Sequence, residues 1–220
     1  MKQNGKCKGI LFDMDGVLVD SEEFIAKAAC AMFAEKGFNK VQPDDFRPFI
    51  GTGEDRFIGG VAEKYGCQLN MPADKVRTYD IYLEMIKGEL QPLEGVKDFI
   101  SQCRARGLKL AVASSADMRK VKGNLAEIGL DNGVFDAIVC GEDVERKKPW
   151  PDVFIQAAEK IGLRAEQCLV IEDAVSGVKA AKAAGAKCLA ITSSFSVDQL
   201  SEADFFAANL AGVGREVIEW

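Results

Sequence analysis

Short, continuously apolar runs recur along the chain, separated by stretches with helical periodicity. The runs cover residues 10–12, 108–113, 137–140, 168–171 and 187–191, with a possible edge strand at Phe205-Phe206. Strands that are apolar on both faces, rather than at alternate positions, are typical of parallel sheets covered on both sides. The pattern therefore predicts a buried parallel sheet.

Four of the intervening stretches predict helices. Apolar residues recur at helical spacing from Val96 to Cys103, and similar spacing covers 117–128, 152–161 and 176–184. Regular alternation of strands and helices is the pattern of an α/β protein. We predict a doubly wound, Rossmann-like parallel sheet.

Residues 20–90 interrupt this alternation. Ser21 is a suitable N-cap for a helix that ends at Gly37, and residues 41–90 continue helically without a convincing strand. We therefore predict an α-helical cap domain at 20–90, inserted into a core formed by residues 1–19 and 91–220.

The composition is that of an ordinary globular protein, with 220 residues, 48% of them hydrophobic, and a mean hydropathy of -0.03. A net charge of -6 argues against nucleic acids or anionic membranes as partners. No apolar run approaches the roughly 18 residues of a membrane span, so we expect a cytoplasmic protein. The 7 cysteines form no Cys-x-x-Cys pair, and we expect them to be reduced.

The chain contains no histidine. This absence excludes Ser-His and Cys-His nucleophilic machinery, histidine zinc sites and a histidine general base. Acid–base chemistry must therefore fall to Asp, Glu, Lys, Tyr or Cys.

Two carboxylates, Asp13 and Asp15, follow the first apolar run and precede Gly16. Acids gathered at the end of a buried strand repel each other, and a hard cation such as Mg²⁺ is the simplest compensation. One carboxylate could then attack phosphorus while the other moves protons. Taken alone, the pair could also be a polar turn or half of a calcium loop.

Further polar groups follow the later strands. Ser114-Ser115, Lys147-Lys148 and Glu172-Asp173 each have an ordinary interpretation as helix caps or a solvated loop. Ligands bind outside the carboxyl ends of the strands in a doubly wound sheet, however, and all these groups fall at that edge with the two aspartates. Acids, a hydroxyl donor and an ammonium together are what phosphoryl transfer requires.

With these groups, the chain resembles the haloacid dehalogenase superfamily. Within it, the chain is similar to the β-phosphoglucomutase-like phosphatase branch, whose members have a helical cap inserted after the first strand. The resemblance covers nearly the whole chain and rests on four motifs: Phe12-Asp13-Met14-Asp15-Gly16-Val17, Val112-Ala113-Ser114-Ser115, Lys148-Pro149-Trp150-Pro151-Asp152 and Ile171-Glu172-Asp173-Ala174-Val175-Ser176-Gly177.

The resemblance implies catalytic roles. Asp13 would be the nucleophile that forms an aspartyl-phosphate, and Asp15 the general acid and then base. Ser114 would hydrogen-bond the phosphoryl group, with Ser115 beside it, and Lys148 would neutralise its charge. Lys147 is a neighbouring candidate, but Lys148 fits the Lys-Pro spacing better.

The resemblance also implies Mg²⁺ as cofactor. Asp13 and the backbone carbonyl of Asp15 would ligate it, and Glu172 and Asp173 would complete the site, directly or through water.

The cap segment 49–54 holds further candidates for substrate binding. Glycines on both sides of a threonine suggest a backbone loop that screens the leaving group, which makes Gly51, Thr52 and Glu54 candidate substrate contacts. Glu54 or Arg56 could read a hydroxyl or a charge on the substrate. A plain helix–helix connection is the alternative.

The resemblance implies a Mg²⁺-dependent phosphohydrolase that acts on a small phosphorylated metabolite. The apolar residues of the cap are scattered, so we expect a monomer. Asp15 and the Glu172-Asp173 pair argue against dehalogenation, and no cap lysine has the apolar setting of a phosphonatase Schiff base. Two alternatives stay open: a β-phosphoglucomutase-type mutase and a non-catalytic module that binds a phosphorylated ligand. Mutases resemble this chain but have a histidine where it has Ile25, an arginine near Glu54 and a lysine near Thr78.

Overall fold

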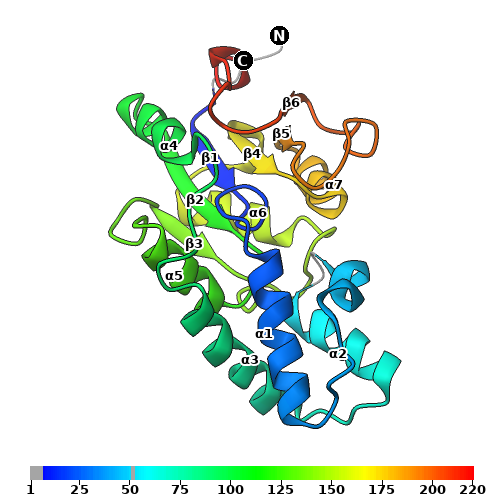
Figure 1. Cartoon of the computed structure of the whole chain (residues 1–220). Helices are drawn as coiled ribbons and strands as arrows, with labels where there is room; N and C mark the ends of the chain where they lie inside the picture. The colour runs from blue at the N-terminus through cyan, green and yellow to red at the C-terminus, as the bar shows by residue number, and fades with distance from the viewer. Residues whose placement is uncertain (1–6, 51–52) are drawn as a thin grey trace.

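A computed structural model describes residues 7–50 and 53–220, and its centre is a six-stranded parallel sheet (Figure 1). The strands follow the order β3-β2-β1-β4-β5-β6. Their bounds are β1 Gly9–Phe12, β2 Lys109–Ala113, β3 Ala137–Val139, β4 Cys168–Glu172, β5 Lys187–Ile191 and β6 Phe205–Ala207. This is the strand order of a doubly wound Rossmann-like sheet, and it confirms the predicted fold class, including the edge strand.

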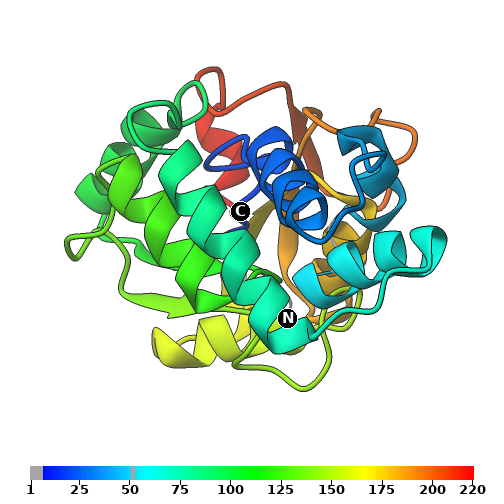
Figure 2. The ribbon, with the colours of Figure 1, turned by 60° about the horizontal axis from the view of Figure 1, so that its bottom comes forward.

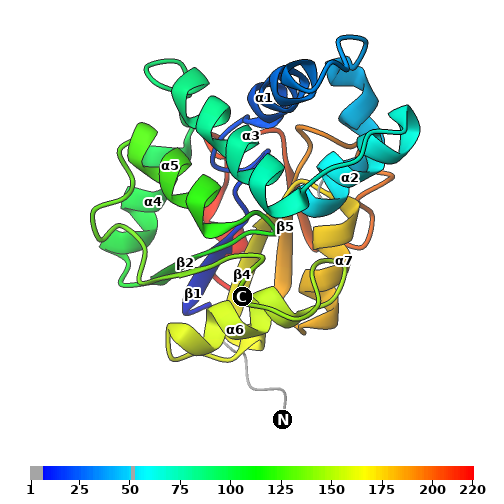
Figure 3. The same ribbon diagram turned by 90° about the horizontal axis from the view of Figure 1, so that it is seen from below.

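Helices cover both faces of the sheet, which is why its strands are apolar on both sides. Figure 3 shows α6 (Asp152–Lys160) and α7 (Val175–Ala183) on one face, and α4 (Val96–Ala105) and α5 (Met118–Glu127) on the other. Successive side chains of β1 point to opposite faces: Leu11 packs on the side of α6 and α7, and Phe12 on the side of α4.

The strand order reverses at β1, whose neighbours are β2 and β4. The chain therefore runs outward from β1 in both directions, which leaves a crevice at the carboxyl ends of these three strands. Segments that follow β1, β2 and β4 must meet there.

The described part of residues 20–90 contains helices and no strand. Its elements are α1 (Glu22–Glu35), the 3-10 helix η1 (Pro43–Phe49), α2 (Glu54–Tyr65) and α3 (Met71–Met85). They gather beyond the carboxyl end of the sheet, with α3 alongside α5 (Figure 2). Buried rings of Phe33, Phe46 and Phe57 pack in this group, the last two with centroids 4.7 Å apart.

Ser21 differs from its predicted role. It precedes α1 but makes no side-chain capping bond, and its buried hydroxyl donates instead to the carboxylate of Asp15. The physical reason is that the backbone of Ser21 is in the right-handed helical region (φ -110°, ψ 0°), not the extended conformation typical of a capping residue, and its hydroxyl is directed to a charged acceptor. The first helical residue is accordingly Glu22.

Two short 3-10 helices complete the described elements, η2 (Ala165–Gln167) and η3 (Arg215–Val217). Within residues 7–50 and 53–220, no helix is both long and apolar enough to span a bilayer. The 7 cysteines are free thiols.

Candidate active site

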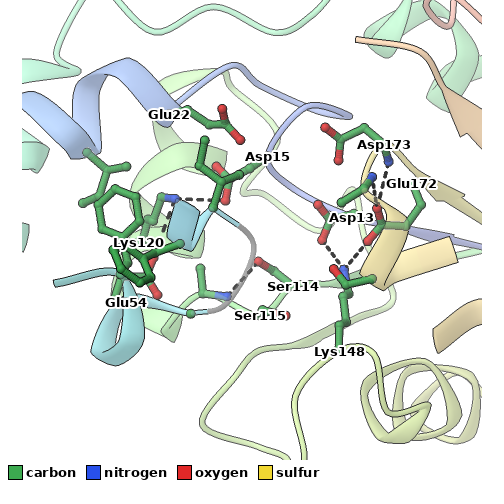
Figure 4. Close-up of a pocket in the computed structure, with 18 of the residues that line it drawn as sticks. Asp13, Asp15, Glu22, Glu54, Ser114, Ser115, Lys120, Lys148, Glu172 and Asp173 are labelled. Carbon is green, nitrogen blue, oxygen red and sulfur yellow. Dashed lines mark hydrogen bonds and ion pairs between the residues drawn. The ribbon is translucent and has the colours of Figure 1, made fainter. Parts of the chain in front are cut away.

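Asp13 stands where β1 ends, in the crevice between β2 and β4. Its carboxylate is buried, and Oδ1 accepts a hydrogen bond from Lys148 Nζ at 2.5 Å. The same ammonium donates to Glu172 Oε1 at 2.6 Å, so one lysine joins segments that follow β1 and β4 (Figure 4). Lys148, rather than Lys147, thus makes the contact with Asp13.

Glu172 and Asp173 lie at the end of β4. The Oε2 atom of Glu172 accepts the backbone N–H groups of Asp173 and Ala174, each at 2.8 Å. The hydroxyl of Ser194, from the loop after β5, donates to Asp173 Oδ2 at 2.5 Å. Each of the two acids is therefore fixed by hydrogen bonds.

Carboxylate oxygens of Asp13, Glu172 and Asp173 lie within 4.8 Å of one another. Oxygen donors at such separation suit a hard divalent cation such as Mg²⁺. Burial raises the pKa values of Asp13 and Asp173, and neighbouring acids, Glu172 among them, add to the effect. Three buried acids with one lysine are short of positive charge, so the donor set fits a Mg²⁺ ion.

The side chain of Asp15 points to a different group of residues. Ser21 donates to one of its oxygens, and Lys120 Nζ donates to Oδ2 at 2.9 Å. Lys120 Nζ also lies 3.7 Å from Glu54 Oε1. The side chain of Asp15 is not among the three clustered acids, and any part it plays in holding a metal falls to its backbone carbonyl, as the resemblance implies.

Both buried lysines are strongly held as cations. Burial alone would lower the pKa of Lys148, but Asp13 and Glu172 outweigh it and raise that pKa. Burial likewise opposes the charge of Lys120, and Asp15 and Glu54 raise its pKa in the same way. Each end of the crevice thus has its own permanent positive charge.

The two serines after β2 line the same pocket. Ser114 is buried, and its Oγ accepts the backbone N–H of Ala116 at 3.1 Å. The Oγ of Ser115 is buried without a hydrogen-bond partner in the described structure. Both serines thus border the pocket that contains Asp13, Glu172 and Asp173.

Only some of the substrate-binding candidates in the predicted cap segment line the pocket. Glu54 lines the pocket, whereas Gly51 and Thr52 lie outside the described residues. Arg56 does not line the pocket: its guanidinium is exposed, pairs with Glu63 at 2.9 Å and lies over the ring of Phe49. Of the two candidates for reading the substrate, only Glu54 is in position.

Three positions, Ile25, Glu54 and Thr78, are those at which this chain differs from the mutases. Ile25 is buried and lines the pocket, as does Glu54. Thr78 is fully buried in α3, donates to the backbone carbonyl of Asp74 and does not line the pocket. The side chains present at the first two positions are therefore an aliphatic group and an acid.

Lys120 and Ser194 were not predicted. A signal for Lys120 exists in the sequence, because it shares the apolar face of α5 with Val121, Asn124 and Leu125, where a lysine is buried only if paired. Ser194 has no such signal, since nothing local distinguishes it from Ser193.

Comparison with known proteins gives a consistent result. The family model of haloacid dehalogenase-like hydrolases matches residues 10–191. The chain is 32% identical to the putative phosphatase YhcW of Bacillus subtilis, with 84% of this chain and 83% of that protein covered. It is 44% identical to the chloroplastic protein SUPPRESSOR OF QUENCHING 1 of Arabidopsis thaliana over 90% of this chain, but spans only 19% of that longer protein.

Solved structures agree on the fold. CbbY from Rhodobacter sphaeroides, in complex with phosphate, superposes with a TM-score of 0.84 at 23% identity, covering 96% of this chain and 99% of that one. The β-phosphoglucomutase of Clostridium difficile gives a TM-score of 0.82 at 19% identity over 96% of this chain and 95% of that one. With the family match over most of its length, the chain belongs to the haloacid dehalogenase-like hydrolases.

Proposed function

We propose that this phosphatase cleaves small phosphorylated metabolites with Mg²⁺ and through an aspartyl-phosphate on Asp13. The observation that carries the proposal is the cluster at the end of β1, where Asp13 meets Lys148, Glu172 and Asp173. A carboxylate nucleophile, a fixed ammonium and an acidic pair for a cation are the parts that phosphoryl transfer needs.

In the first step, Asp13 would attack phosphorus while the bond to the leaving oxygen breaks and Asp15 gives that oxygen a proton. Lys148 and the hydroxyl of Ser114 would stabilise the negative charge on the phosphoryl oxygens. In the second step, Asp15 would take a proton from water, which attacks phosphorus, frees Asp13 and yields inorganic phosphate.

Asp13 and Asp173, with Glu172 directly or through water, would hold Mg²⁺. Both Glu172 oxygens already accept hydrogen bonds, which favours the contact through water. The cation would neutralise phosphoryl charge that Lys148 alone cannot.

We further propose that residues 20–90 act as a cap domain over this crevice. Glu54 and Ile25 reach the pocket from the cap helices, whereas the phosphoryl-binding groups come from the core. Such a lid excludes water from the first step and contacts the leaving group.

The mutase alternative is weaker on physical grounds. A mutase must hold a bisphosphate by both ends, and Glu54 presents a negative charge where the second phosphate would lie. A non-catalytic binding module would have no need for a nucleophile together with an acid–base partner.

The test is phosphate release from a panel of phosphate esters, with and without Mg²⁺, by wild-type protein and Asp13→Asn. We expect Mg²⁺-dependent release, reduced about a thousandfold or more in the variant. Asp98→Asn, at an exposed position of α4, is the matched control and should keep the wild-type rate. No release by wild type would leave the binding module, and conversion of β-glucose 1-phosphate to glucose 6-phosphate without net release would establish the mutase.

A further inference from the structure

The pocket has two chemically different ends (Figure 4). At one end, Asp13, Lys148 and Asp173 form the phosphoryl site described above. At the other, cap residues meet α5, and the lining combines apolar side chains with charged ones. The apolar members are Ile25, Phe49, Ile50, Phe57 and Ala116, and the charged members are Glu22, Glu54 and Lys120, with Asp15 between the two ends.

Glu54 at this second end is buried but only half satisfied. Its side chain belongs to the first residue of α2 and is 5% exposed. Oε1 faces Lys120 Nζ at 3.7 Å, while Oε2 has no hydrogen-bond partner in the described structure. Because a buried carboxylate oxygen without a donor is unfavourable, a ligand that brings a hydrogen-bond donor to this side chain would be stabilised.

Lys120 does not make this end of the pocket an anion site. Its ammonium already donates to Asp15 at 2.9 Å and faces Glu54, so its charge is shared between two acids. Among the described residues that line the pocket, the only other cation is Lys148, which is paired with Asp13 and Glu172. Around Lys120, three acids, Asp15, Glu22 and Glu54, therefore outnumber the single lysine.

We propose, building on the phosphatase function above, that Glu54 determines which leaving groups are accepted. Its free oxygen accepts a hydrogen bond from a hydroxyl of the leaving group, so the preferred substrates are monophosphate esters of polyhydroxy compounds. Esters whose leaving group bears a second phosphate or a carboxylate are rejected, because an acid near Glu54 would be repelled and both lysines that line the pocket are already paired with acids.

The experiment compares matched esters that differ in one group. Glycerol 3-phosphate and 3-phosphoglycerate share a three-carbon frame, but a hydroxymethyl group in the first is a carboxylate in the second. We expect wild-type kcat/KM to favour glycerol 3-phosphate by about tenfold or more. The same preference should hold for glucose 1-phosphate over glucose 1,6-bisphosphate.

Glu54→Gln keeps the size and hydrogen-bonding capacity of the side chain but removes its charge. We expect the ratio of the two kcat/KM values to fall towards one, whereas a purely structural defect would lower both values together and leave the ratio unchanged. Glu63→Gln removes an exposed charge from the same helix and should keep the wild-type ratio.

The wild-type comparison decides the matter without any variant. If p-nitrophenyl phosphate is hydrolysed with Mg²⁺ but 3-phosphoglycerate is taken as well as glycerol 3-phosphate, the role of Glu54 is overturned and the phosphatase function stands. An unchanged ratio in a folded Glu54→Gln protein also overturns it. If no ester is hydrolysed, the proposed function fails, and this inference fails with it.

Discussion

At the scale of single residues, the hydroxyl of Ser194 is the part of the acidic cluster most open to a clean test. It donates to Asp173 Oδ2 from a loop after β5, outside the four motifs. Outer partners of this kind orient a metal-binding carboxylate without touching the metal, and losing one typically weakens metal binding. Asp173 itself is buried, so its orientation depends on such contacts.

Ser194→Ala should therefore raise the Mg²⁺ concentration needed for half-maximal activity by about tenfold or more. The rate at saturating Mg²⁺ should stay close to that of wild type, because the nucleophile and Lys148 are untouched. Titrating activity with Mg²⁺ measures both quantities. Ser196→Ala, whose hydroxyl bonds Gln199, is the control, and an unshifted Mg²⁺ midpoint in Ser194→Ala would show that this hydroxyl does not position Asp173.

At the scale of elements, the first turn of α7 is fitted against the end of β4. A Cβ placed on Gly177 would lie 1.7 Å from Glu172 Oε1, far inside any contact distance. The Glu172 carboxylate cannot easily move away, since Lys148 and two backbone N–H groups hold it. The glycine of the fourth motif thus makes room for the acid that anchors Lys148.

Gly177→Ala should lower the free energy of unfolding by about 1–3 kcal/mol, the usual cost of overpacking, and reduce kcat because Lys148 loses its second partner. Urea unfolding and steady-state kinetics measure the two effects. Gly212→Ala adds the same methyl group where nothing lies within 4 Å. The account would fail if the two variants behaved alike.

The 3-10 helix η1 is tied to α2 by Asp45. Its carboxylate accepts hydrogen bonds from Lys64, from the backbone N–H of Gln42 and from the hydroxyl of Tyr65. The bond from Lys64, followed by that from Gln42, lowers the pKa of Asp45 from 3.8 to about 2. A lowered carboxyl pKa stabilises the folded state above the unfolded pKa, and this contribution is lost as the pH falls through the folded value.

Asp45→Asn should therefore destabilise the protein at pH 7, by no more than about 1 kcal/mol because water screens the partly exposed pair. The difference from wild type should shrink as the pH is lowered from about 4 towards 2. Urea unfolding at a series of pH values provides the measurement, with Asp44→Asn on the same helix as control. A difference that persists undiminished at the lowest pH would rule out this titration.

How much the sequence predicts depends on how local the signal is. Strands such as β4 were predictable because they are apolar at nearly every position. Asp13 was predictable because it directly follows an apolar run, and Lys148 because it precedes a proline in a recognisable motif. Lys120 was not, because its partner Asp15 lies 105 residues away, and only the folded chain brings them together. Ser21 does stand at the N-cap position of α1, but its capping bond is absent, because the turn after β1 brings the carboxylate of Asp15 to its hydroxyl.

At the scale of the whole molecule, the inserted helices are joined to the core mainly where α3 lies against α5. Lys75 pairs with Asp117 at 2.8 Å, and Arg119 pairs with Asp80 at the same seam. These ion pairs are partly exposed and contribute little individually. Between them lies a buried contact, in which the Tyr82 hydroxyl donates to Asn124 Oδ1 at 2.5 Å.

That buried hydrogen bond should carry more stability than the surrounding ion pairs. Tyr82→Phe leaves the Oδ1 atom of Asn124 buried without a donor, next to an Nδ2 atom that already has no partner in the described structure, so we expect a loss of about 1–3 kcal/mol in the free energy of unfolding. Tyr79→Phe is the matched control on the same helix. The Tyr79 hydroxyl is buried near acids but has no hydrogen-bond partner of good geometry among the described residues.

Removing the Tyr79 hydroxyl should therefore be neutral or stabilising, although both substitutions delete one oxygen from a buried tyrosine of α3. Urea unfolding of the two variants beside wild type makes the comparison. Equal losses would mean that the hydrogen bond to Asn124 contributes no more to stability than the Tyr79 hydroxyl does, which would contradict this prediction. A larger loss in Tyr82→Phe would instead assign most of the link between α3 and α5 to this buried hydrogen bond rather than to the ion pairs around it.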